Sequence, residues 1–146
     1  MDYGFDTREL DKYAKDMMSF ANDKLPKESK KYLKKSAGKL STVNKNTFKS
    51  SGAAAGSGFT ENEMVKRFKA GKTYKYNGNL SCRAYAGHPL AHLSDLGFIH
   101  KGGFKIKDGP EKFIPGYHFM AKASQKYEST YYTDTQNFIN DMIKNI

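Results

Sequence analysis

Four histidines and one cysteine are the residues of this 146-residue chain with the clearest capacity for chemistry. His88 and His92 are four residues apart, the spacing that brings two imidazoles onto one helix face in some zinc sites. Pro89 disfavours helix at His88, and no carboxylate or cysteine at ligand spacing completes the set. We therefore expect no metal and no cofactor. The expected role of the imidazoles is structural, with hydrogen bonds to loop backbone.

The same histidines leave a second kind of chemistry open. With Lys and Tyr they would supply the acid–base groups and the phosphate clamp of a metal-independent nuclease, the further candidates being His100 and His118. No spacing in the sequence specifies such a site. Cys82 beside a histidine would form a nucleophilic pair, but its position in an alternating strand pattern favours a buried, apolar thiol. We therefore expect that the protein is not an enzyme.

The charge distribution points to polyanions as a class of partner. Lys and Arg number 25 against 15 Asp and Glu, which gives a net charge of +10. Nine lysines and one acidic residue lie between Lys24 and Lys49. The candidate contacts with a polyanion are Lys30, Lys31, Lys34 and Lys35. A solvated helix face is the alternative, because this segment has two aromatic residues and no Arg for base recognition.

Composition excludes several other classes of protein. No apolar run approaches the roughly 18 residues of a membrane span, so we expect no membrane insertion. The first ten residues, MDYGFDTREL, carry acidic groups where a signal peptide needs a basic stretch. Cys82 has no second cysteine with which to form an intramolecular disulfide. Folding in a reducing cytoplasm is the simplest interpretation.

Two helices are predicted in the N-terminal third. The first is expected near residues 7–22, with Asp6 and Glu9 as a capping box and an apolar stripe on one face. The stripe consists of Leu10, Tyr13, Met17 and Phe20. After a break at Asn22 and Asp23, Pro26 suits the first turn of a second helix that reaches the mid-40s. Its thin apolar stripe predicts that it covers a core from outside.

The middle of the chain predicts loops around a β-hairpin. Residues 50–58 are small and glycine-rich, which favours a flexible loop, and Thr60–Lys69 is expected to form a short helix. Asn77-Gly78 is a strong two-residue turn signal at the centre of a hairpin over about residues 72–86. A second flexible loop is expected at about 100–116, with short strands near 104–107 and 113–114.

From Tyr117 the helical period returns and continues to the end. The shared stripe is Met120, Ala123, Tyr127, Tyr131, Phe138 and Met142. A kink or break is expected near residues 130–135, where Thr and Tyr cluster. The fold class is thus α+β in a single domain, residues 1–146, with two N-terminal helices, a small antiparallel sheet and a long C-terminal helix.

Several short motifs occur in an order that one family shares. The first helix opens with Phe5-Asp6-x-x-x-Leu10, and Leu25-Pro26 enters the second. The hairpin leads to His92-Leu93-Ser94-Asp95-Leu96-Gly97, and Gly116-Tyr117-His118-Phe119-Met120-x-x-Ala123 opens the final helix. In these motifs the chain resembles the minor tail component, or tail-completion, family of tailed bacteriophages. Asp95 stands where that family generally has Glu.

The resemblance implies a structural α+β protein that forms a ring at the head-proximal end of a phage tail. Its partners would be other copies of itself, six by family analogy, tail-tube or tail-terminator proteins, and head-completion or connector proteins. It would be made in the bacterial host cytoplasm and reside in the virion, with DNA nearby but not specifically bound. The interface candidates are His92, Leu93, Asp95, Gly97, Phe138, Ile139 and Met142.

Two other functions stay open on the residues alone. The first is a basic nucleic-acid-binding module that uses the Lys24–Lys49 segment. The second is the small metal-independent nuclease, for example a toxin. The tail-completion function is the one we expect, because its motifs occur in order across most of the chain.

Overall fold

The computed structural model describes residues 7–53, 58–100 and 111–145, and it confirms the α+β class. The helices are α1 (Arg8–Ser19), the π-helical turn η1 (Phe20–Lys24), α2 (Leu25–Ser51), α3 (Gly58–Lys66), α4 (Ala91–Leu96) and α5 (Phe119–Lys144). The strands are β1 (Phe68–Ala70), β2 (Tyr74–Tyr76), β3 (Asn79–Ser81), β4 (Ala84–Ala86), β5 (Gly97–His100) and β6 (Lys112–Pro115). Among the described residues, no helix is long and apolar enough to cross a membrane.

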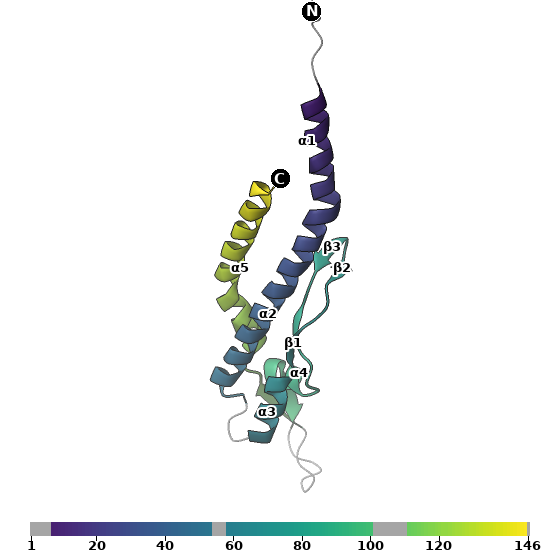
Figure 1. Ribbon diagram of the computed structural model, residues 1–146. Coiled ribbons are helices and arrows are strands. Elements are labelled where there is room, and N and C mark those ends of the chain that lie inside the picture. Colours follow the sequence, from purple (N-terminus) through teal and green to yellow (C-terminus); the bar gives the residue numbers. More distant parts are fainter. Residues whose placement is uncertain (1–6, 54–57, 101–110, 146) are drawn as a thin grey trace, which may run out of the picture.

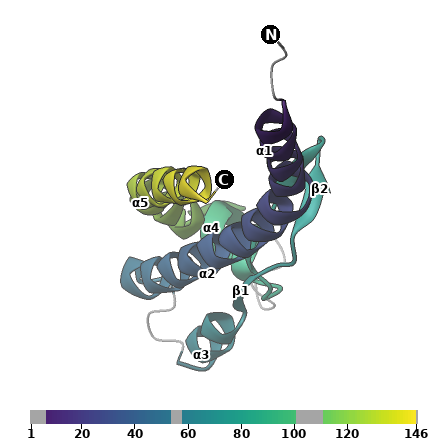
Figure 2. The ribbon, with the colours of Figure 1, turned by 45° about the horizontal axis from the view of Figure 1, so that its top comes forward.

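The predicted break at Asn22 and Asp23 is wrong, because α1, η1 and α2 form one bent rod (Figures 1 and 2). The backbone N–H of Leu25 donates to the carbonyl of Phe20, five residues earlier. Pro26 lies in the first turn of α2, as predicted, and has no N–H to donate to a preceding carbonyl. A wider π turn absorbs this interruption without ending the helix. The predicted cap, Asp6, lies outside the described residues.

The prediction that the second helix only covers the core is wrong, since α2 is the central element. It lies between α5, which runs antiparallel beside it, and a β ribbon formed by strands β1 to β4 (Figure 1). Its buried residues are mostly small or polar: Ser36, Ala37, Ser41, Asn44, Thr47 and Phe48. Small side chains let two neighbours approach the helix backbone closely, and this burial left little apolar signal in the sequence.

The apolar core gathers at one end of the rod, around three phenylalanine rings. Phe48 of α2 lies 5.5 Å from Phe68 of β1 and 5.2 Å from Phe119 of α5, measured between ring centroids. Phe68 and Phe119 are 6.0 Å apart in an edge-to-face arrangement. Met64 and Ala91 complete the buried cluster. The core therefore joins α2, the ribbon and α5 at the point where α3 and α4 also pack.

The predicted hairpin is present and is longer than expected. Asn77 and Gly78 form the turn with φ of 49° and 78°, and β2 pairs with β3 on either side. The ribbon continues as β1 paired with β4, in the register Phe68 opposite Ala86. Residues 68 and 69, predicted to be helical, therefore belong to a strand. Between the two paired regions, residues 71–73 face residues 82–83, so the first strand carries one extra residue, a β-bulge.

Strands β5 and β6 form a second antiparallel pair, with Phe98 opposite Ile114. The strand expected near 113–114 is thus confirmed, whereas β5 was not predicted, and most of the loop expected at about 100–116 lies outside the described residues. Residues 104–107 lie outside the described residues. The predicted loop at 50–58 is too long, because residues 50–51 complete α2 and Gly58 begins α3, while residues 54–57 are outside the described residues.

The C-terminal helix is continuous from Phe119 to Lys144, so a break at 130–135 is wrong. Within that segment the hydroxyl of Thr133 donates to the carbonyl of Ser129, four residues earlier. This bond satisfies the threonine side chain locally, so the Thr and Tyr cluster does not end the helix. The predicted stripe is confirmed, since Ala123 and Tyr127 are buried and the other members are half-buried.

The turn predicts the effect of a β-branched residue at Gly78. Its positive φ is a conformation that valine adopts only with strain, so Gly78→Val should lower the free energy of unfolding by about 1 kcal/mol or more. Gly78→Asn is the matched control, because Asn tolerates the left-handed region. Urea unfolding followed by circular dichroism measures both. An unchanged midpoint for the valine variant would show that this turn contributes no strain.

Candidate functional site

Two of the four sequence motifs that carry the family resemblance meet in space, at the junction between α4 and the start of α5. The backbone N–H groups of Tyr117 and His118 donate to the carbonyls of Ser94 and Asp95, each at 2.9 Å. The carboxylate Oδ1 of Asp95 accepts a hydrogen bond of 3.2 Å from the backbone N–H of Met120, in the first turn of α5. Asp95 therefore caps a helix that begins more than twenty residues later.

Two glycines let the backbones approach closely at this motif junction. A Cβ atom at Gly116 would collide with the carbonyl oxygen of Asp95. A Cβ atom at Gly97, whose φ is +94°, would lie 2.6 Å from the carbonyl oxygen of Ile114. Both positions therefore require glycine. Asp95 and Gly97, two of the predicted interface residues, have structural roles within the chain.

The histidines do not gather into a catalytic or metal site in the described part of the chain. His88 Nδ1 accepts a hydrogen bond of 3.1 Å from the backbone N–H of Leu90, which is the structural role expected for it. His92 is exposed on α4, and His118 precedes α5 with a φ of 52°. No group of three metal-ligating side chains occurs among the described residues. Of the predicted loop residues, His92 is thus the exposed one, while Leu93 is half-buried.

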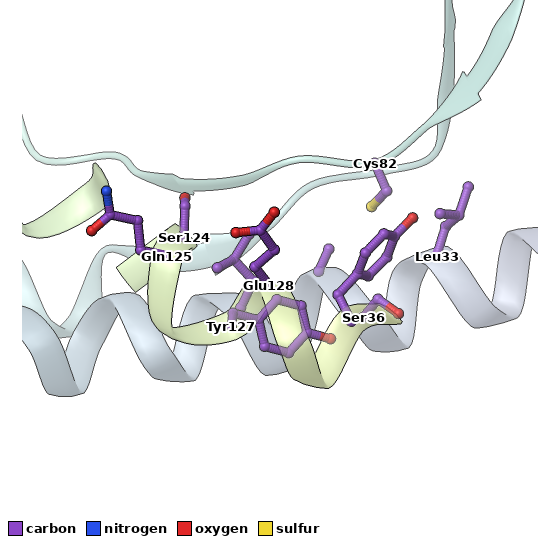
Figure 3. Close-up of a pocket in the computed structure, with 10 residues that line it drawn as sticks. Leu33, Ser36, Cys82, Ser124, Gln125, Tyr127 and Glu128 are labelled. Carbon is purple, nitrogen blue, oxygen red and sulfur yellow. The ribbon is translucent and has the colours of Figure 1, made fainter. Parts of the chain in front are cut away.

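An apolar groove of about 440 Å³ runs between α2, α5 and the ribbon (Figure 3). Its lining residues are Leu33, Ser36, Ala37, Leu40, Cys82, Ser124, Gln125, Tyr127, Glu128 and Tyr131. Cys82 projects into it from the ribbon, beside the bulge, and its thiol donates to the carbonyl of Gly71 at 3.3 Å. The thiol is half-buried, so the prediction of a buried strand cysteine is wrong: the bulge ends the strand before this residue.

One polar group in the groove lacks a hydrogen-bond partner. Tyr127 is 7% exposed, and its hydroxyl forms no hydrogen bond of acceptable geometry with the described residues. Burial raises the pKa of this hydroxyl above 10.0, and the nearby Ser36 hydroxyl acts in the opposite direction. A buried hydroxyl without a well-aligned partner is costly, so Tyr127 is expected to stabilise the fold no more than phenylalanine would at this position.

The opposite side of the helix pair has a second, more polar cavity of about 340 Å³, where aromatic and ionic contacts join α2 to α5. Tyr32 of α2 stacks on Phe138 of α5 with ring centroids 4.5 Å apart, and its hydroxyl bonds to that of Thr135. Lys39 Nζ lies 2.6 Å from Asp134, and this hydrogen bond raises the pKa of Lys39. Phe138, a predicted interface residue, is thus part of the chain's own packing. Met142 is half-buried, whereas Ile139 is 45% exposed and free for a partner.

The lysine-rich segment lies on the exposed side of α2. Lys30, Lys31, Lys34 and Lys35 are all exposed. Lys31 pairs with Glu28 at 3.3 Å, while Lys30, Lys34 and Lys35 have no acidic partner within the described ranges. The sequence identified this surface correctly as basic and solvated. It gave no signal for the groove, which combines residues from three elements that are far apart along the chain.

A scan of protein-family models, a search of curated proteins and a search of solved structures each found no match to this chain.

The motif junction predicts that Asp95 stabilises the fold through one hydrogen bond. Asp95→Ala removes the acceptor for the Met120 N–H and should lower the free energy of unfolding by about 1 kcal/mol, as for loss of a helix cap. Asp95→Asn retains an oxygen acceptor and should cost less. Equal losses for the two variants in urea unfolding would contradict the capping role.

Tyr127 predicts a change of stability at alkaline pH. The fold favours the neutral phenol over the phenolate. The contribution of Tyr127 to the free energy of unfolding is therefore fully present below pH 10.0 and is lost as the pH rises through its raised pKa. Tyr127→Phe should remove that fall and leave the stability near neutral pH unchanged or slightly higher, because the lost hydroxyl has no partner in the described structure. Urea unfolding across this pH range compares the two proteins. A clear loss at neutral pH in the variant would show that the hydroxyl is bonded.

Proposed function

We propose that this chain is a structural protein of a tailed phage, a prophage or a tail-like particle. In this proposal it completes the tail end and joins it to the head or neck as one subunit of a ring. Its partners are other copies of itself, tail-tube or tail-terminator proteins, and head-completion or connector proteins. The order of the family motifs along the sequence supports the assignment, and so does their meeting at one junction, where Asp95 caps α5.

The observation that carries the proposal is the amount of uncovered surface. The chain has an accessible surface of 11254 Å², whereas a compact monomer of 16.5 kDa is expected to expose about 7,500 Å². The difference is larger than the roughly 1,600 Å² that both sides of a standard interface bury together. A ring subunit needs this kind of surface, because it contacts two copies of itself and the neighbours above and below.

The position of the core is consistent with the same function. The phenylalanine cluster and the motif junction hold one end of the molecule together, while the rod extends away from it (Figure 1). Large apolar side chains stay exposed on α1 and α5, including Leu10 at 65% and Ile139 at 45%. Such faces are typical of proteins that bury them on assembly.

A nucleic-acid-binding module is the second candidate, favoured by the unpaired lysines of α2. Lys30, Lys34 and Lys35 face solvent without an acidic partner in the described structure, which suits non-specific contact with phosphates. The two functions make different demands on the surface. A tail-joining protein depends on exposed apolar side chains, whereas a polyanion-binding module depends on these lysines.

Complementation of a particle-forming strain that lacks this gene separates the two. Ile139→Asp should block joined heads and tails, because it places a charge on an exposed apolar position of α5. Reversal of Lys30, Lys31, Lys34 and Lys35 to Glu should leave the fold intact, since all four are exposed. Electron microscopy scores finished particles. A point variant is preferable to a truncation of α5, because a truncation that removes Phe138 would also remove its stacking on Tyr32.

Asn140→Asp is the matched control, because it adds the same charge at a neighbouring exposed position that is not apolar. It should assemble normally. If the Ile139 variant assembles particles while the lysine reversal alone blocks them, the polyanion-binding function replaces the one proposed. Particles that form without the protein would exclude both roles in assembly.

A further inference from the structure

Helix α1 carries an apolar face that the described chain covers only in part, since Met17 is half-buried. No residue of α1 is buried, and Leu10, Tyr13 and Met18 are 65%, 56% and 65% exposed. Leu10, Tyr13 and Met17 recur at three- and four-residue spacing, so they share one side of the helix, which we call the arm stripe. An amphipathic helix of this kind normally packs its apolar side against another surface. No surface that covers Leu10 and Tyr13 occurs among the described residues.

The chain's own groove is out of reach of its own arm stripe. The rod is continuous through η1, because Leu25 N–H bonds to Phe20 C=O and no loop separates α1 from α2. Figure 1 shows α1 directed away from the core, beyond the end of α5. If the arm stripe docks into the groove of this protein, it therefore docks into the groove of a different copy.

We propose that α1 of one copy docks its arm stripe into the groove of the next copy, between α2, α5 and the ribbon. The groove holds about 440 Å³, room for a few large side chains, and its walls include Leu33, Leu40 and Tyr131. Tyr127 also forms part of the groove wall, and its hydroxyl is buried behind that surface. The uncovered surface is large enough for two such contacts per chain.

Charge favours a second copy as the occupant. Residues 1–24 hold six acidic and four basic groups, a net charge of −2, whereas residues 25–146 hold nine acidic and twenty-one basic groups, a net charge of +12. Glu9, Asp16 and Asp23 recur every seven residues, which places them in a row along one edge of the arm stripe. Helix α1 itself is neutral, with three acidic and three basic residues, so this row of carboxylates is what attracts it to the basic body of another copy.

This contact is heterologous, since arm and groove are different surfaces of the same chain. Head-to-tail contacts of this type close into rings when the rotation per copy allows it. The inference rests on the proposed function, which requires copies of the chain to meet, and it names the surfaces by which they do so.

The native Cys82 in the groove provides the test. Leu10→Cys, Tyr13→Cys and Met17→Cys each place one thiol on the arm stripe, and all should fold because α1 buries no residue. With a short bis-maleimide cross-linker, purified protein and assembled particles should give a ladder of linked chains. The ladder should disappear in the Cys82→Ser background. Lys12→Cys, on the opposite side of α1, is the matched control and should link several-fold less.

Three results would overturn the inference. Equal linking from Lys12→Cys would show that contact is not specific to the arm stripe. Linked dimers that persist in the Cys82→Ser background would show that α1 pairs with α1. If particles require the protein but show no Cys82-dependent linking, the proposed function stands and α1 contacts a different protein. Conversely, a Cys82-dependent ladder in a strain whose particles form without the protein would support the docking and remove the proposed function.

Discussion

The rest of the structure depends on the contact between three phenylalanine rings at one end of the rod. Phe48, Phe68 and Phe119 come from α2, the ribbon and α5, and their centroids lie 5.2 to 6.0 Å apart. Only 38% of the chain is hydrophobic, so the apolar material suffices for one such cluster. Beyond it, α2 and α5 are held by small residues and by the stacking of Tyr32 on Phe138. Because the apolar side chains gather at one end, the other end of the rod, α1, buries no residue.

Local signals in the sequence predicted the elements that local physics controls. Asn77-Gly78 fixed the turn because positive φ values are favourable there, and the apolar period located both long helices. The errors arose where tertiary contacts outweighed local preference. Phe68 suited a helix as well as a strand, and its partner Ala86 decided for the strand. Pro26 signalled a helix start, but a π turn allowed the rod to continue through it.

The residues of the candidate site also fall into two groups, those that local sequence signals identify and those that depend on tertiary contacts. Asp95, Gly97 and Gly116 were visible in the sequence as motif residues, but their role as a cap and as points of close backbone approach needed the contact with α5. The groove was not predictable, because Leu33, Cys82 and Tyr127 come from three separate elements. The arm stripe was predictable as a pattern. That it has no partner in the described chain is visible only in three dimensions, because a sequence cannot show whether an apolar face finds cover in its own fold.

The position of the acidic groups bears on how copies of this chain would associate. A body with a net charge of +12 keeps copies apart in solution, and that repulsion opposes contact between the exposed apolar faces. On α1, Glu9 and Asp16 lie beside an apolar face that is largely exposed, so the basic body of another copy is attracted to this end of the rod. Association is then directed to one orientation, arm to body, rather than body to body. A chain with a small core and a large exposed surface can in this way stay separate until copies meet in the arrangement that buries both faces.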